Sequence, residues 1–193
     1  DLTYIYYGKE LLPYVRHHYL KTVWEEFMNR PIEQQLFEEI ITFVTQWFHP
    51  EKDIFYSDIE KELDQIAQDV MEYLEIENFR HPIFKISQKQ FLFWKRNDLD
   101  QDQWDNCDAR QILDILVKIF FHELKYHEII LSGTVNIIRN YLIEKSVYIV
   151  QVAILFQSIA RRLGNIRCDL LCFPKLDLLS EKYWLLKWKP KYG

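Results

Sequence analysis

Apolar residues recur at helical spacing along most of the first hundred positions. One stripe covers 12–27, a second follows Pro31 and stops at His49-Pro50, and a third follows Ser57. Apolar side chains three and four positions apart share one face of a helix, so each stretch predicts an amphipathic helix with that face in the core. The three stripes consist of Leu12, Val15, Tyr19, Val23, Trp24 and Phe27, then Leu36, Phe37, Ile40, Ile41, Val44, Trp47 and Phe48, then Leu63, Ile66, Ala67, Val70 and Leu74.

Local signals predict where several of these helices begin. Ser57 and Glu60 match the S-x-x-E capping box, in which each side chain satisfies a free backbone N–H of the first turn. Ser87 with Gln90 predicts the same arrangement at the start of a short helix. Pro13 is compatible with a helix only in the first turn, so the first helix is expected to begin near it.

The second half of the chain combines helices with strands. The polar, acidic segment 97–106 predicts a junction, followed by helices at 108–122, 135–144 and 148–163, the last ended by Gly164. Two short apolar and aromatic runs, 168–173 and 183–188, predict strands. The expected fold is therefore mainly α with a small C-terminal antiparallel β element. The expected domains are a helical lobe at 1–105 and an α+β piece at 106–193.

Charge is divided unevenly between these two parts. Residues 1–105 carry 21 acidic and 11 basic side chains, a net charge of −10, whereas residues 106–193 carry 8 acidic and 13 basic ones, a net charge of +5. The asymmetry is consistent with attraction between the two lobes, or with an anionic partner for the second one.

Three candidate sites for metals or nucleotides fail on spacing. The acidic run at 98–102 opens like a calcium loop, but Gln103 replaces the turn glycine and Ala109 the bidentate acid. His122 and His127 are one residue too far apart for a zinc-binding HExxH helix, so their rings would point about 140° apart. The 4 glycines form no phosphate-binding loop. We therefore expect neither a metal nor a cofactor.

Cysteine usage and hydropathy bear on the compartment. An odd number of cysteines, Cys107, Cys168 and Cys172, in a chain of 193 residues does not suggest a disulfide framework. The longest apolar run, 147–156, is shorter than the ~20 residues that a membrane-spanning helix needs. We expect an intracellular protein, cytoplasmic or nuclear, without a membrane partner.

Several segments resemble the F-box only protein 21 family. The helix ending Ala160-Arg161-Arg162-Leu163-Gly164, the segment 167–174 ending in Phe-Pro, and the aromatic strand 184–188 are similar to that family's transglutaminase-like core. Segments at 46–57, 81–84 and 103–105 are similar to its helical region. The second piece, 106–193, would then be a partial transglutaminase-like core.

The resemblance implies a substrate receptor of a Skp–cullin–F-box ubiquitin ligase. Such receptors bind the Skp adaptor, and through it the cullin, with an N-terminal F-box, and the family carries a hemimethylated-DNA-binding-like domain at its C-terminus. Neither is recognisable in this sequence, which begins at Asp1 and is expected to be a fragment. The expected partner of the fragment itself is a protein substrate of the ligase, bound by a region that serves recognition and scaffolding.

Two of the family's catalytic positions are degenerate in this sequence. Aligned on the Arg-Arg-Leu-Gly motif, the nucleophile position holds Gln151, and a neutral amide cannot attack an acyl carbon. The histidine position falls at Tyr183, and no histidine occurs between Pro174 and Trp184. We therefore predict no catalytic residues.

Two alternatives remain open. One is an active transglutaminase-like or cysteine-protease-like acyl transferase that uses a thiol at another position. The other is a fragment that binds single-stranded nucleic acid, suggested by alternating lysines and aromatics at 184–192. The overall pI of about 5.7 does not favour nucleic acid, and lysines on an edge strand commonly prevent aggregation.

Overall fold

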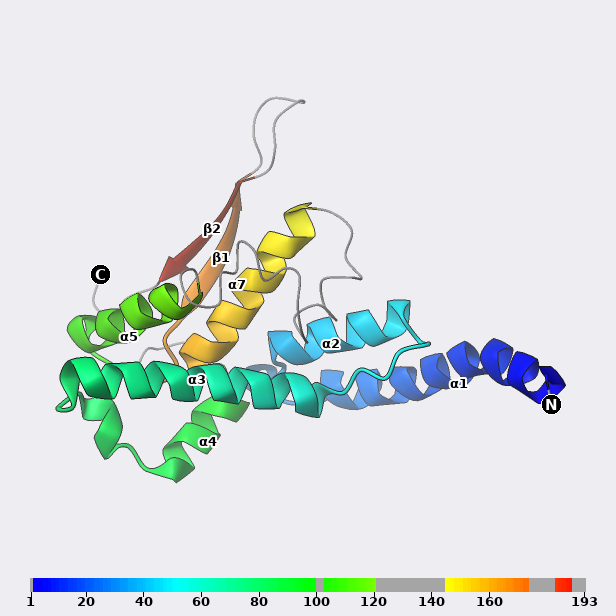
Figure 1. Cartoon of the computed structure of the whole chain (residues 1–193), viewed down its shortest axis with the longest axis horizontal. Helices are drawn as coiled ribbons and strands as arrows, with labels where there is room; N and C mark the ends of the chain where they lie inside the picture. Colours follow the sequence, from blue (N-terminus) through cyan, green and yellow to red (C-terminus); the bar gives the residue numbers. More distant parts are fainter. Residues whose placement is uncertain (1, 100–102, 121–144, 174–182, 189–193) are drawn as a thin grey trace.

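The computed structural model describes residues 2–99, 103–120, 145–173 and 183–188 (Figure 1). The chain is mainly helical, with one small antiparallel sheet, as predicted. The elements in chain order are α1 (Leu2–Met28), a 3-10 turn (Ile32–Gln34), α2 (Phe37–Phe48), α3 (Tyr56–Asn78), a 3-10 turn (Pro82–Lys85), α4 (Gln88–Arg96), α5 (Asn106–Lys118), α7 (Lys145–Arg162), β1 (Cys168–Phe173) and β2 (Tyr183–Trp188).

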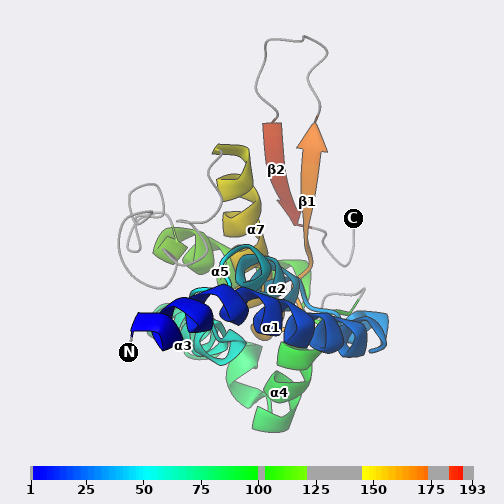
Figure 2. The same ribbon diagram turned by 90° about the vertical axis from the view of Figure 1, so that its right-hand side faces the viewer.

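Helix α7 is the centre of the structure. It packs against α2, α3, α4 and α5 and also contacts the sheet formed by β1 and β2. Figures 1 and 2 show the sheet rising beside α7, on the side of the helices opposite α4. Side chains near the C-terminal end of α7 can therefore reach several elements at once.

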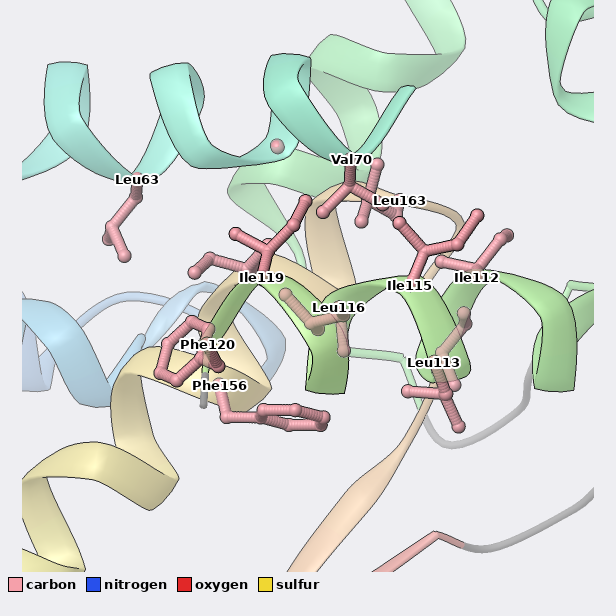
Figure 3. Packing of buried hydrophobic residues seen from close by; sticks show 14 of the residues in the cluster. Leu63, Val70, Ile112, Leu113, Ile115, Leu116, Ile119, Phe120, Phe156 and Leu163 are labelled. Carbon is pink, nitrogen blue, oxygen red and sulfur yellow. The ribbon is translucent and has the colours of Figure 1, made fainter. Parts of the chain in front are cut away.

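The hydrophobic core lies between α3, α5 and α7 (Figure 3). Val70 on α3 and Leu116 on α5 are fully buried, and the rings of Phe120 and Phe156 meet edge to face at 5.5 Å. The apolar face predicted for α3 is confirmed as core, and the helix predicted at 108–122 contributes Ile112, Leu116, Ile119 and Phe120 to it. One continuous cluster joins residues from both sides of the proposed boundary at 105/106, which stays a prediction.

The two strands match the predicted ranges. They pair antiparallel, with Cys168 opposite Trp188 and Phe173 opposite Tyr183. A two-stranded sheet is marginal on its own in water, so its packing against α7 stabilises it.

The capping box predicted at Ser57 is wrong. Helix α3 begins at Tyr56, and its N-cap is Phe55, two residues before Ser57; a phenylalanine side chain cannot cap a helix. The cause is tertiary: Ile54 is buried, and Gln46 Nε2 donates a hydrogen bond to its carbonyl at 2.6 Å, which anchors the chain just before the helix. At α4 the N-cap part of the prediction is confirmed, because Ser87 Oγ accepts a hydrogen bond from the Gln90 amide at 3.3 Å.

Two further helix starts differ from the predictions. Helix α1 begins at Leu2, so Pro13 lies in its interior instead of its first turn. The segment after Pro31 forms a 3-10 turn, and α2 begins only at Phe37, although it ends before His49 as expected. The helix predicted at 135–144, together with His122 and His127, lies outside the described residues.

The predicted core faces of α1 and α2 are also wrong in large part. The side chains of Phe37, Trp47 and Phe48 on α2 are exposed. The buried face of α2 instead carries Glu38, Thr42 and Thr45. On α1, exposure extends to Val15, Tyr19 and other large apolar residues, because α1 packs mainly on α2. Among the described helices, none is long and apolar enough to span a membrane.

Candidate functional site

Two consecutive arginines at the end of α7 turn into the protein. Arg161 donates hydrogen bonds from Nη1 to the carbonyls of Trp94, at 2.8 Å, and Lys95, and it forms an ion pair with Glu38. Arg162 donates from Nη1 to Glu38 Oε1 at 3.0 Å and to the Ser158 carbonyl at 2.8 Å. Both arginines are almost completely buried, so their positive charges depend on these partners.

Glu38 on α2 is the counter-charge for both guanidinium groups. It is only 1% exposed, and its Oε2 accepts a third hydrogen bond from Ser158 Oγ at 2.9 Å. Burial by itself would raise the pKa of Glu38, but the nearby Arg161 and Arg162 outweigh burial and lower the pKa below its usual value. Glu38 is therefore ionised at neutral pH.

A second acid extends this arrangement to α3 and α4. Asp64 Oδ1 accepts from Arg162 Nε at 3.0 Å, and Asp64 Oδ2 accepts from Lys95 Nζ at 2.5 Å. Lys95 also pairs with Glu60 at 3.1 Å. We call this set the ionic cluster: Glu38, Glu60, Asp64, Lys95, Arg161 and Arg162. Three negative charges balance three positive ones, and the ionic cluster ties α2, α3, α4 and α7 together.

A glycine and a tryptophan complete the end of α7. Gly164 has φ +123°, a conformation that L side chains rarely adopt, and a Cβ added there would lie 1.7 Å from Trp104 Nε1. That Nε1 donates to the Leu163 carbonyl at 2.8 Å. His81 stacks edge to face on Trp104 with ring centroids 5.5 Å apart. Thus three segments that carry the family resemblance, 81–84, 103–105 and 160–164, meet at one place.

Asn165 and His81 hold the surrounding loops. Asn165, with φ 54°, accepts from the Leu99 amide at 3.1 Å and donates to the Leu99 carbonyl at 2.8 Å. The buried His81 accepts from the Ile83 amide through Nδ1, and its Nε2 donates to the Asp108 carbonyl. The side chains of Asn165 and His81 therefore hold these loops in place.

The two positions predicted to be degenerate catalytic positions fall in described elements. Gln151 lies inside α7, beyond its first turn, and Tyr183 is the first residue of β2. The stabilising field of a helix is strongest in its first turn, so position 151 would not gain the full effect on a nucleophile. The side chains of both residues are outside what the structure describes, and their assignment stays a prediction.

The chemistry of the ionic cluster is structural. Each of its carboxylates is engaged by a cation, and Ser158 donates to Glu38 instead of to a base. Within residues 2–99, 103–120, 145–173 and 183–188, no group of three or more His, Cys, Asp or Glu side chains could hold a metal ion. The lysines at 189 and 191, on which the nucleic-acid hypothesis partly rests, lie outside the described residues.

Glu38, Asp64 and Lys95 are not among the site residues predicted from the sequence. A signal for Glu38 did exist, since Glu38, Thr42 and Thr45 follow a helical spacing and form a polar stripe beside the apolar one. A polar stripe of this kind is equally typical of a helix face that is exposed to solvent. The burial of Glu38 becomes interpretable only when α7 supplies its arginines.

The ionisation of Glu38 predicts sensitivity to acid. A carboxylate with a lowered folded-state pKa stabilises the protein above its unfolded pKa, here about 4.5, and this stability is lost as pH falls through the folded-state value. We expect the free energy of unfolding, measured by urea titration, to fall below about pH 5, and to fall less steeply in Glu38→Gln. Glu39 contributes to the pH dependence with the opposite sign: burial raises its pKa, so its protonation stabilises the folded protein as the pH falls. Glu39→Gln removes this contribution and should make the decline in stability slightly steeper. Equal pH profiles for wild type and Glu38→Gln would contradict this prediction.

Comparison with curated proteins gives distant relatives of one kind. The chain is 24% identical to human F-box only protein 21 in an alignment of 192 positions that covers 97% of this chain and 28% of the relative. The same values hold for F-box only protein 21 of Pongo abelii, and the protein of Mus musculus is 22% identical over 190 residues. The chain resembles the F-box only protein 21 family and spans only 28% of the length of these relatives. No family model and no solved structure matches the chain.

Proposed function

We propose that this chain is the non-catalytic interaction and scaffold region of an F-box-type substrate receptor in a Skp–cullin–F-box ubiquitin ligase. The observation that carries the proposal is the resemblance to F-box only protein 21, which extends over 97% of the chain. The F-box would bind the Skp adaptor and the cullin, and the present region would hold a protein substrate. Ubiquitin transfer would then belong to partner proteins, in the cytoplasm or the nucleus.

Within this region, residues 1–105 would form the helical lobe and residues 106–193 a degenerate, partial transglutaminase-like core. The order of α7 followed by antiparallel β1 and β2 is compatible with such a core. Gln151 and Tyr183 at the expected nucleophile and histidine positions support a loss of catalysis. The ionic cluster supports a scaffold role, because it holds four helices in a fixed arrangement.

A fusion protein tests the receptor function. An F-box known to bind Skp would be joined before residue 1, and ubiquitin transfer would be measured in cells with an active or an inhibited cullin. We expect the fusion to increase cullin-dependent ubiquitination of proteins that co-purify with it, relative to the F-box alone. If the fusion and the isolated F-box give the same pattern while both bind Skp, the receptor function is wrong.

The absence of catalysis gives a separate prediction. We expect no incorporation of a fluorescent amine into a glutamine-donor protein above the level of a heat-denatured sample, because Gln151 cannot act as a nucleophile. Alkylation of the cysteines should make no difference. Incorporation that alkylation abolishes would instead favour the acyl-transferase alternative.

A further inference from the structure

A groove of about 440 Å³ lies between α3 and α4, with the end of α7 at its floor. The two helices both pack on α7, and Figure 1 shows α4 crossing below α3. Six apolar side chains line the groove: Ala67, Met71, Ile86, Phe91, Leu92 and Leu163. The amide side chains of Gln68 and Gln88 also line it, together with Asp64, Lys95 and Arg162 of the ionic cluster.

One buried donor at this groove has no partner. Arg162 uses Nε and Nη1 in hydrogen bonds, but its buried Nη2 has none. In a planar guanidinium, Nε–H and one Nη2–H point to the same side, and a carboxylate usually accepts from both. Here Asp64 takes only Nε, because its second oxygen binds Lys95. The free Nη2–H is therefore directed to the side of Asp64, which lines the groove.

An unpaired buried N–H destabilises the protein, so an acceptor supplied by a ligand would recover this loss. The acceptor should be neutral, because the ionic cluster already balances three acids against three bases, and an added carboxylate would lie beside Asp64 without a counter-charge. A backbone carbonyl satisfies this condition. The apolar lining next to Arg162 requires an apolar side chain close to that carbonyl.

We propose that the groove between α3 and α4 binds an extended peptide segment of a partner protein. The segment places one large apolar side chain among Met71, Phe91 and Leu92, and a neighbouring backbone carbonyl accepts from Arg162 Nη2. Gln68 and Gln88 at the rim pair with further backbone groups of the peptide. The inference rests on the proposed function, in which this region holds a protein substrate, and it assigns where that substrate docks.

Access to Nη2 requires one side-chain movement. The atom is buried under the groove, beside Asp64, whose side chain is 41% exposed. The movement is a rotation of the Asp64 carboxylate that keeps Oδ1 on Arg162 Nε and releases Lys95, which retains its ion pair with Glu60. Rearrangements of side chains of this size are common when proteins bind peptides.

The chain offers a matched pair of variants for a test. Leu92 lines the groove and is 48% exposed, whereas its neighbour Phe93 is 47% exposed and does not line it. Neither Leu92→Glu nor Phe93→Glu should unfold the protein. The probes are hexapeptides with an acetylated N-terminus and an amidated C-terminus, whose central pair is leucine, methionine, phenylalanine, serine, aspartate or lysine, added to ¹⁵N-labelled protein and followed by NMR.

We expect the leucine, methionine and phenylalanine peptides to shift amide signals of groove residues, and the aspartate and lysine peptides to leave them unchanged. Leu92→Glu should weaken binding at least tenfold and Phe93→Glu less than twofold. A thioamide, a poorer acceptor than a carbonyl, should weaken binding at one peptide position only. No shifts with any peptide, equal effects of the two variants, or a preference for the charged peptides would overturn the groove assignment.

The same variants separate this inference from the receptor function. If peptides bind as expected but the F-box fusion ubiquitinates nothing beyond the F-box alone, the groove stands and the receptor function fails. If the fusion is active and Leu92→Glu leaves its substrates unchanged, the receptor function stands and the groove is not where they dock.

Discussion

Replacing Glu38 with glutamine is expected to lower the free energy of unfolding by about 3–5 kcal/mol, the usual cost of removing one partner from a buried ion pair. Glu38 is the acid shared by Arg161 and Arg162, both nearly inaccessible to solvent. The glutamine side chain has nearly the volume of glutamate, and its amide oxygen can still accept hydrogen bonds. The loss of stability therefore reports the effect of removing the negative charge. Urea unfolding followed by tryptophan fluorescence measures the effect.

Glu39→Gln is the matched control on the next residue of α2. Glu39 pairs with Arg30 at 2.9 Å; the Arg30 side chain is 41% exposed, and burial of the Glu39 carboxylate opposes its ionisation, so the pair gains little from its charge. An ion pair of this kind contributes about 0–1 kcal/mol, so the control should change stability by no more than that. Similar losses in the two variants would mean that the ionic cluster does not hold the helices together.

Gly164→Ala is expected to destabilise the protein by about 2–6 kcal/mol. The backbone at φ +123° costs an L residue about 1–3 kcal/mol, and the new Cβ would overlap the Trp104 indole, which adds about 1–3 kcal/mol of overpacking. Displacing the indole would also break its hydrogen bond to Leu163. The tryptophan fluorescence of the folded protein should therefore change, and the unfolding midpoint should move to a lower urea concentration.

The same substitution at another glycine, Gly8→Ala, is expected to stabilise the protein, whereas Gly164→Ala destabilises it. Gly8 is exposed within α1, and no atom lies within 4 Å of the position that a Cβ would occupy. Alanine in a helix interior is favoured over glycine by about 0.5–1 kcal/mol, so this variant should be slightly more stable. A Gly164→Ala protein as stable as wild type would show that Trp104 does not pack on Gly164.

The sequence predicted those elements whose local pattern and tertiary role agree. Helix α3 buries the stripe that contains Leu63 and Val70. The two strands have the predicted ends because each is a run of apolar and aromatic residues with a proline one or two positions beyond it. In α2 the local pattern and the tertiary role disagree, because apolar Trp47 and Phe48 are exposed while polar Glu38 is buried. Periodicity identifies a helix with two different faces, but the neighbouring elements decide which face is covered.

The candidate site was less predictable because its members are remote in sequence. Arg161 and Arg162 belong to a motif that the sequence shows, yet their partner Glu38 lies more than 120 positions earlier. Without the fold, an isolated glutamate on a helix carries no sign of burial. The N-cap Asp105, which accepts from the amides of Cys107 and Asp108, was missed although its type is typical of caps.

The separation of 123 residues between Glu38 and Arg161 has a consequence for synthesis of the protein on the ribosome. At about 5–20 residues per second, Glu38 is made roughly 6–25 s before its arginine partners. During that interval Glu38 has no counter-charge, and α7, which packs on it in the folded protein, is still missing, so its carboxylate remains exposed to water. The polar face of the nascent α2 therefore stays hydrated until α7 is complete. A ribosome that pauses between the synthesis of α2 and that of α7 prolongs the time in which this half of the chain depends on chaperones.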